Sequence, residues 1–273
     1  MDTRAAIAAI FSNRRALVGV IHVGALPGAP TRSQSVEQVS AAAVADARAY
    51  RDAGFSGLMV ENMHDRPYLR RVVGPETVAA MTVVAAAVRR EVPGLPLGIQ
   101  VLAGANRESI AVAHACGARF VRVEGFVFAH VADEGLMQSD AGELLRYRRS
   151  IGAEAVAVFA DIKKKHSAHA LTADVDIAET AHAAEFFLAD GVIVTGTSTG
   201  RPADPAEVKA VAAAVAIPTL VGSGITPENI AGFAAADAFI VGTSPKREGL
   251  WSNPVDPARA AALVKAFERL KAP

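Results

Sequence analysis

The sequence has almost no cysteine and no excess of charge of either sign. Cys116 is the only cysteine among 273 residues, which excludes an internal disulfide and with it a secreted disulfide scaffold. Lysine plus arginine and aspartate plus glutamate both number 28, so the formal net charge is zero. Because no basic excess is available for a phosphate backbone, we expect no nucleic-acid partner.

Long apolar runs are missing as well. No uninterrupted apolar stretch reaches the roughly 18 residues that a membrane span needs. At the N-terminus, Asp2 and Arg4 precede a short apolar segment without a small-residue cleavage site, which is the wrong pattern for a signal peptide. We therefore expect a soluble, cytoplasmic protein without membrane insertion.

Three common site motifs are also absent. The chain has no P-loop, which argues against a nucleotide hydrolase, and no His-Glu-x-x-His pair, which argues against a tight zinc site. After the first apolar run, the segment 24–28 has Pro27 where the helix of a dinucleotide-binding unit should begin. An open doubly wound sheet is therefore disfavoured.

Eight short apolar runs alternate with amphipathic helical stretches along the whole chain. Each run is nearly continuously apolar, which is typical of parallel strands covered by helices. The predicted strands are Leu17–Val23, Gly57–Asn62, Leu97–Leu102, Phe120–Gly125, Val156–Ile162, Gly191–Gly196, Thr219–Gly224 and Phe239–Thr243. The predicted helices are Val36–Ala53, Glu76–Arg90, Arg107–Ala115, Ala141–Ser150, Val175–Leu188, Pro205–Val215, Pro227–Ala235 and Pro257–Leu270. This order predicts an α/β fold, a (β/α)₈ TIM barrel forming a single domain over residues 1–273, with residues 1–15 as an N-terminal helical extension.

The last two predicted strands both end in glycine-bearing turns. Glycine lets the backbone approach a ligand closely, so that successive amides converge on an anion. In TIM barrels the loops after the last two strands commonly hold a phosphate. The predicted phosphate-binding residues are Gly222, Ser223, Gly224, Gly242, Thr243 and Ser244.

Carboxylates end three other predicted strands, where the chemistry of a barrel is built. Glu61, Glu124 and Asp161 would converge on one barrel mouth, and such crowding raises carboxylate pKa values unless a cation or proton is shared. Lys165 or His166 could supply that compensation and an acid–base pair. The alternative is that each carboxylate caps a helix or forms a structural ion pair, and that the lysine run at 163–165 is a solvated loop.

These residues suggest particular roles. Asp161 and Glu61 are the predicted general base and acid, Lys165 would stabilise developing negative charge, and Glu124 completes the predicted catalytic set. A Schiff-base role for Lys165 is a weaker alternative. The predicted substrate-binding residues are His22, Asn62, Gln100, His166 and Thr195. We predict no metal ligand, although the oxygen and nitrogen ligands at the mouth leave a loosely held Mg²⁺ open as a cofactor.

Several stretches fit one known family. They are Val20–His22 with Leu26–Gly28, Val60–Asn62 with Asp65, Gly74–Thr77, Glu143–Arg148, Ala160–Asp161 with Lys165–His166, Thr195–Gly196 with Thr199–Gly200, and Val221–Gly224 with Ile240–Thr243. On these residues the chain resembles the BtpA family, in register over nearly its whole length. The resemblance implies a barrel of the ribulose-phosphate-binding type. Gln100 and Glu124 depart from the family pattern, in which asparagine is common at both positions.

Two functions from different classes are consistent with these patterns. The first is an enzyme acting on a phosphorylated sugar or a nucleoside- or nucleotide-like small molecule, as a lyase, an isomerase or an enzyme that cleaves a glycosidic bond. The second is the role from which the family takes its name, a non-catalytic assembly or stability factor for a membrane protein complex, photosystem I. The alanine-rich outer helices also suggest a homo-oligomer.

Overall fold

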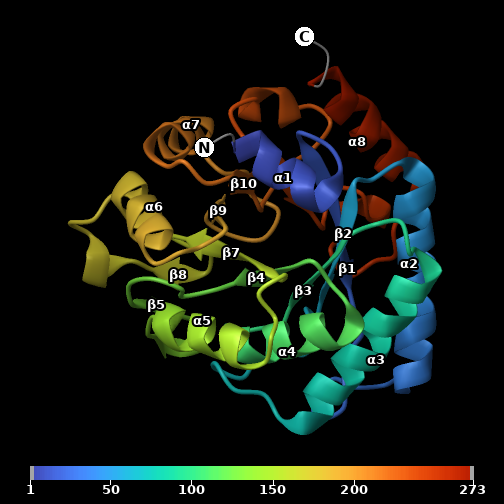
Figure 1. Ribbon diagram of the computed structural model, residues 1–273. Coiled ribbons are helices and arrows are strands. Elements are labelled where there is room, and N and C mark those ends of the chain that lie inside the picture. Colours follow the sequence, from blue (N-terminus) through green and yellow to red (C-terminus); the bar gives the residue numbers. More distant parts are fainter. Residues whose placement is uncertain (1–2, 271–273) are drawn as a thin grey trace.

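Eight parallel strands close into a barrel surrounded by helices (Figure 1), as the sequence predicts. The computed structural model describes residues 3–270, with the side chain of Arg4 left out. In spatial order, the barrel strands are β1 (Ala16–His22), β11 (Ala238–Val241), β10 (Thr219–Val221), β9 (Gly191–Val194), β7 (Ala157–Ile162), β4 (Phe120–Val123), β3 (Leu97–Gln100) and β2 (Gly57–Glu61). The covering helices are α2 (Val36–Ala53), α3 (Pro75–Glu91), α4 (Asn106–Cys116), α5 (Ala141–Ser150), α6 (Ile177–Phe186), α7 (Pro205–Ala214) and α8 (Pro257–Arg269).

Local capping explains where several of these helices begin. Ser35 forms a capping box with Gln38 at the start of α2. Asp204 and Asp256 accept backbone N–H bonds at the starts of α7 and α8, each ahead of a proline in the first turn. These signals are local in the sequence, so the predicted starts of these three helices agree with the structure.

The predicted helix at Pro227–Ala235 is wrong. The structure has only a short 3₁₀ helix, η2 (Ile230–Phe233), between β10 and β11. The Asn229 side chain accepts a bond from the Thr226 amide at 2.8 Å and donates one to the Gly224 carbonyl at 2.8 Å. These two bonds fold the segment into a turn, so Thr226 does not serve as a helix cap.

The N-terminal helix α1 (Thr3–Phe11) closes one end of the barrel. Figure 1 shows it lying across the barrel opening. Ile7 and Phe11 are buried among the side chains that fill the barrel interior, and the Phe11 ring lies 5.4 Å from that of Phe120. Apolar groups fill this end of the barrel. The polar site therefore lies at the opposite end, where the carboxyl ends of the strands meet.

A small antiparallel sheet that the sequence did not predict lies among the loops at that other end. It consists of β6 (Gly135–Met137), β5 (His130–Ala132) and β8 (Ser167–Ala168). The first two strands follow β4, whereas β8 follows β7. The pairing of β5 with β8 therefore ties together two loops that carry predicted site residues.

Glycine at position 98 is required by the packing of the barrel interior. A Cβ atom at Gly98 would lie 2.1 Å from the ring of Phe120. We expect Gly98→Ala to lower the free energy of unfolding by about 1–3 kcal/mol, measured by urea denaturation, because an overpacked interior must shift. Gly94→Ala is the control, since a Cβ there meets no atom within 4 Å. Equal stabilities for the two variants would contradict the packing argument.

Candidate active site

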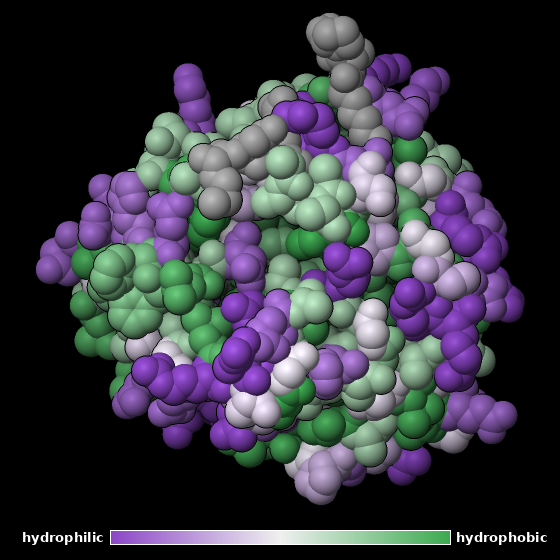
Figure 2. Space-filling view, in the orientation of Figure 1, coloured by the Kyte–Doolittle hydropathy of each residue, from purple (hydrophilic) through white to green (hydrophobic). Residues whose placement is uncertain are grey.

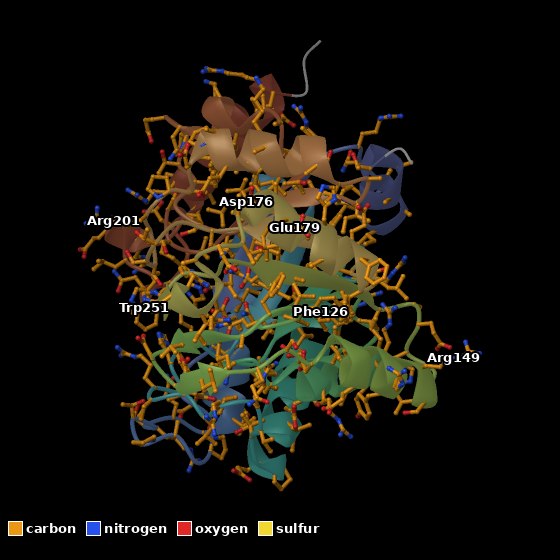
Figure 3. The ribbon with its side chains drawn as sticks, turned by 90° about the vertical axis from the view of Figure 1, so that its left-hand side faces the viewer. Phe126, Arg149, Asp176, Glu179, Arg201 and Trp251 are labelled. Atoms are coloured by element: carbon orange, nitrogen blue, oxygen red, sulfur yellow. The ribbon has the colours of Figure 1, made fainter. Side chains whose placement is uncertain are left out.

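Two adjoining cavities open at the carboxyl ends of the barrel strands. Their volumes are about 200 and 310 Å³, and we call them the glycine-turn cavity and the acid cavity. They share Glu61, Met63, Arg122, Lys165 and Thr199, so they are two halves of one mouth. In Figure 3 the labelled Trp251, which lines the acid cavity, and Arg201 lie on one side of the molecule, and Arg149 lies on the opposite side.

The predicted phosphate-binding turns line the glycine-turn cavity. The amides of Gly224, Gly242 and Thr243 form no hydrogen bond to any other described residue, so they remain available to an anion. Gly242 is needed here because a Cβ would lie 2.8 Å from the imidazole of His22. The Ser223 hydroxyl, by contrast, donates to the Arg201 carbonyl at 2.7 Å, so it holds a neighbouring loop.

An arginine outside the predicted set also lines the glycine-turn cavity. Arg259, in the first turn of α8, donates from Nε to the Ser244 carbonyl at 2.9 Å. It brings a positive charge beside the two turns. The sequence offered no signal for it beyond its place just after a helix cap.

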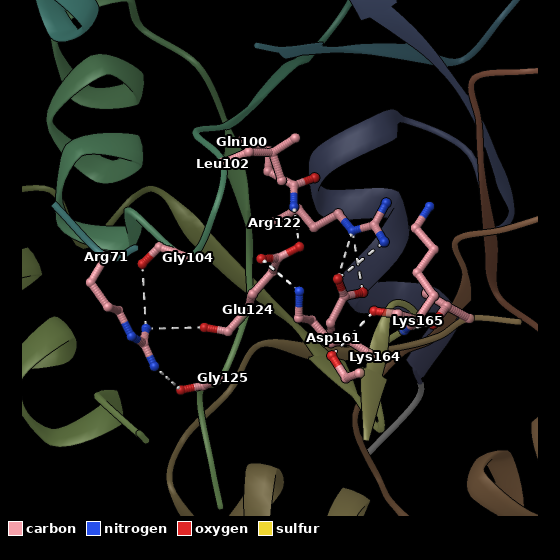
Figure 4. A network of polar contacts seen from close by, with 12 residues as sticks. Arg71, Gln100, Leu102, Gly104, Arg122, Glu124, Gly125, Asp161, Lys164 and Lys165 are labelled. Carbon is pink, nitrogen blue, oxygen red and sulfur yellow. Dashed lines mark hydrogen bonds and ion pairs between the residues drawn. The ribbon is translucent and has the colours of Figure 1, made fainter. Parts of the chain in front are cut away.

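Arg122 is the central charged residue of the mouth, although the sequence analysis did not select it. It lies within β4 and is buried, and its guanidinium meets the Asp161 carboxylate on β7 at N···O distances of 3.0, 3.1 and 3.2 Å (Figure 4). A buried charge requires such a partner. An arginine inside an otherwise apolar strand run is a signal that could have revealed it.

The Glu124 carboxylate also has a cationic partner. Lys164 Nζ lies 3.3 Å from one of its oxygens, and Gln100 Nε2 donates to the other at 3.4 Å (Figure 4). Arg71 donates to the Glu124 and Gly125 carbonyls at 3.1 and 2.8 Å, which fixes the end of β4. The compensating cation is therefore Lys164, not the predicted Lys165 or His166.

Glu61 and Lys165 are the two charged groups of this cluster that lack a direct partner. Among the described residues, neither side chain forms a hydrogen bond or an ion pair, and both line both cavities. Burial raises the pKa of Glu61, while Arg122 and Lys165 oppose the rise. Burial, and next the charge of Arg122, lowers the pKa of Lys165. Both groups are thus shifted toward their neutral forms.

Asp161 lies deeper than the other predicted catalytic residues. Burial raises its pKa and Arg122 opposes this rise. Its carboxylate binds Arg122, and it lines neither the glycine-turn cavity nor the acid cavity. The structure therefore places the predicted general base beneath the mouth, in contact with the arginine.

The lysine run is not a uniform solvated loop. Lys163 Nζ donates to the carbonyl and hydroxyl of Thr172 at 2.7 and 3.1 Å, Lys164 pairs with Glu124, and Lys165 faces the mouth. Left-handed backbone conformations at Lys163 and His166, with φ of 45° and 55°, turn three adjacent side chains in different directions.

Two predicted substrate-binding residues have open polar atoms at the mouth. Gln100 Oε1 is buried without a hydrogen-bond partner among the described residues and lines the acid cavity. His22 Nδ1 donates to the Trp251 carbonyl at 2.8 Å, while burial, and next Lys246, lowers the pKa of His22 to about 3. His22 is therefore neutral, and its Nε2 is an acceptor beside Gly242.

The other three predicted substrate-binding residues mainly hold backbone. Asn62 accepts from the Leu102 amide at 2.7 Å, and the Thr195 hydroxyl accepts from the Lys165 amide at 3.0 Å. His166 lines the acid cavity, but its Nε2 accepts from the Thr199 amide at 3.1 Å. Burial, and next Lys165, lowers the pKa of His166.

The carboxylates at the mouth form no ready-made cluster of metal ligands among the described residues. Within residues 3–270, no three histidine, cysteine, aspartate or glutamate side chains gather so that they could hold a metal ion. The carboxylates of Glu124 and Asp161 bind Lys164 and Arg122, which leaves Glu61 as the unpaired carboxylate of the cluster.

Sequence similarity to known proteins identifies the family of this chain. The BtpA family model matches residues 13–269. The chain belongs to the BtpA family. One relative in this family is the photosystem I biogenesis protein BtpA of a Synechocystis species, 34% identical over 94% of this chain and 89% of its own length. Another is an uncharacterized mitochondrial protein of Caenorhabditis elegans, 44% identical over 99% of this chain and 100% of its own.

Solved structures show the same fold at low sequence identity. The geranylgeranylglyceryl phosphate synthase of Thermoplasma acidophilum, solved with sn-glycerol-1-phosphate, aligns with a TM-score of 0.61 at 16% identity, over 98% of this BtpA-family chain and 99% of its own. Phosphoribosyl anthranilate isomerase of Thermus thermophilus aligns with a TM-score of 0.56 at 14% identity, over 93% of this chain and 98% of its own. No described helix is long and apolar enough to cross a membrane, and the cytoplasmic location stays a prediction.

Removing the carboxylate of Asp161 should leave the buried charge of Arg122 without its partner. We expect Asp161→Asn to lower the free energy of unfolding by about 3–5 kcal/mol in urea denaturation, because a buried cation loses its partner. Glu154→Gln is the control, since Glu154 pairs with Arg149 at the surface and its loss should cost less than about 1 kcal/mol. Similar losses in both variants would contradict this account of Arg122.

The buried neutral His22 should make stability depend on acid pH. Its pKa of about 3 lies below the ordinary 6.5, so its contribution is fully present above pH 6.5 and is lost as pH falls toward 3. We expect His22→Gln to flatten the dependence of unfolding free energy on pH in this range by at most about 1.4 kcal/mol per pH unit. His182→Gln, at an exposed position on α6, is the control for a histidine substitution at the surface. An unaltered slope in His22→Gln would refute the assignment.

Proposed function

We propose that this BtpA-family protein is an enzyme acting on a phosphorylated sugar or a nucleotide-like small molecule by acid–base chemistry. The observation that carries the proposal is the unpaired couple of Glu61 and Lys165. Both line the two cavities of the mouth, and free backbone amides line one of these cavities with them. Groups with shifted pKa values in a cleft are typical of catalytic sites.

The substrate phosphate would bind the amides of Gly224, Gly242 and Thr243, with Arg259 beside them. This assignment needs no positively charged cluster, because converging amides carry the partial positive charge that an anion requires. The structural neighbours whose names include a phosphorylated compound support this class of substrate in a general way.

The reacting part of the substrate would lie between Glu61, Lys165 and Arg122. Glu61, shifted toward its protonated form, would act as general acid and base with Lys165 as its partner. Arg122 would stabilise developing negative charge. In place of the role predicted from sequence, Asp161 would then be a positioning residue for Arg122, and the open oxygen of Gln100 would accept a bond from a substrate hydroxyl.

A second candidate function has two observations in its favour. The Synechocystis relative is named for photosystem I biogenesis. Phe186, Phe187 and Leu188, at the end of α6, are 81, 49 and 69% exposed, and Figure 2 shows apolar side chains on the side where α6 lies. An exposed apolar group of this kind suits docking to a protein partner, as an assembly factor requires.

Binding of a phosphosugar can be followed through Trp251, which is the only tryptophan and lines the acid cavity. We expect ribose 5-phosphate to change its fluorescence and to bind at least about tenfold more tightly than ribose, a difference of about 1.4 kcal/mol. Glu61→Gln should keep this binding but lose about 10²–10⁴-fold in turnover of any substrate found by NMR screening of phosphosugars and nucleotides.

The matched controls separate the two candidate functions. Gly242→Ala should weaken the phosphate-dependent part of binding, because the new Cβ meets His22, whereas Gly94→Ala should not. Equal affinity for phosphorylated and unphosphorylated ligands across the panel would overturn the enzyme proposal. The assembly role would be favoured if substituting Phe186–Leu188 abolished assembly of the partner complex while Glu61→Gln did not.

A further inference from the structure

Lys165 has the surroundings of a nucleophilic amine. The two residues before it, Lys163 and Lys164, are held by Thr172 and Glu124, but the Lys165 ammonium has no direct hydrogen bond or ion pair within the part of the chain that the structure describes. It lines both halves of the mouth, as Glu61 does, and it shares the glycine-turn cavity with the free amides of the glycine turns. In Figure 4 its side chain extends alongside the guanidinium of Arg122.

Three conditions for attack on a carbonyl group meet at this lysine. The amine must be neutral, and burial and Arg122 both favour the neutral form. An acid must protonate the departing oxygen, and Glu61 is shifted toward its protonated form in the same cavities. The substrate must also be anchored through a group that is remote from its carbonyl carbon. The amides of the glycine turns can provide this anchor by binding a phosphate.

We propose that Lys165 forms an imine with the carbonyl carbon of an open-chain aldehyde or ketone phosphate. This proposal rests on the proposed function, because it uses the same phosphate subsite. It narrows the substrate class from phosphorylated small molecules in general to those with a free carbonyl group.

The step balances without an oxidant or reductant. The Lys165 lone pair forms the N–C bond, and the carbonyl π electrons move to oxygen, which takes the proton of the Glu61 carboxyl group. The nitrogen then returns a proton to the Glu61 carboxylate. The carbinolamine C–O bond breaks as Glu61 protonates the hydroxyl group, one water leaves, and the C=N bond of a protonated imine forms. Glu61 ends as a carboxylate beside that cation.

The competing role for Lys165 is that of a simple counter-charge for the phosphate. Arginine keeps the positive charge but cannot form the imine, so Lys165→Arg separates the two roles. Lys163→Arg is the matched control, because Lys163 lies two residues before Lys165 in the sequence but binds Thr172 outside the mouth.

The test is reductive trapping. The full-length protein is incubated with ribose 5-phosphate, glyceraldehyde 3-phosphate or dihydroxyacetone phosphate, treated with sodium borohydride, and examined by intact mass spectrometry and peptide mapping. We expect one borohydride-dependent adduct per chain with at least one of these probes, located on Lys165. The mass gain should equal that of the probe less one oxygen atom.

The variants determine the outcome. Lys163→Arg should be labelled like the wild-type protein, whereas Lys165→Arg should show at least about tenfold less adduct while still binding the phosphosugar in the Trp251 fluorescence titration. An absent adduct, or an equal adduct in Lys165→Arg, overturns the imine. If phosphosugar binding persists in that event, the proposed function stands, and if binding is absent too, both proposals fail.

Discussion

The ion pair between Arg122 and Asp161 is the interaction on which the geometry of the mouth depends. Arg122 projects from β4 into a space where a charge is tolerated only beside a partner, and β7 supplies that partner from the adjacent strand. Because α1 fills the opposite end of the barrel with apolar side chains, the pair lies at the boundary between an apolar interior and a polar mouth. It fixes a cation at the centre of the site without assistance from a flexible loop.

The charges around this pair are balanced, and that balance leaves one couple free. The cluster contains three carboxylates and three cations. Arg122 binds Asp161 and Lys164 binds Glu124, which leaves Glu61 and Lys165 without direct partners. The phosphate of the proposed substrate would therefore not meet a strongly positive cleft, and its charge would be met largely by backbone amides and Arg259.

The barrel could be predicted from sequence because its signals are local and repeated. Eight apolar runs and their caps are visible residue by residue, whereas the turn at η2 depends on side-chain bonds of Asn229 that have no periodic signature. The small sheet was missed because β5, β6 and β8 are three residues long or shorter, and because β8 joins β5 from a different loop. Their sequences carry no alternation long enough to detect.

The site was predictable in position but only partly in its contacts. Strand-end residues such as Glu61 and Gln100 do reach the mouth, yet Thr195 and Ser223 hold backbone. The Ser223 hydroxyl binds the carbonyl of Arg201, in the loop after β9, and the Thr195 hydroxyl in the same loop binds the amide of Lys165.

A continuous set of bonds thus joins the glycine turn after β10 to the lysine that follows β7. The His166 imidazole and the Thr199 amide add a second tie between the same two loops. A lysine three residues beyond its strand would otherwise sample many positions, at a cost in side-chain entropy when it is fixed. The backbone of Lys165 is bonded to the loop that also supports the glycine turn after β10, so Lys165 is held in register with the amides of the proposed phosphate site. Neither local pattern nor residue spacing could reveal that coupling.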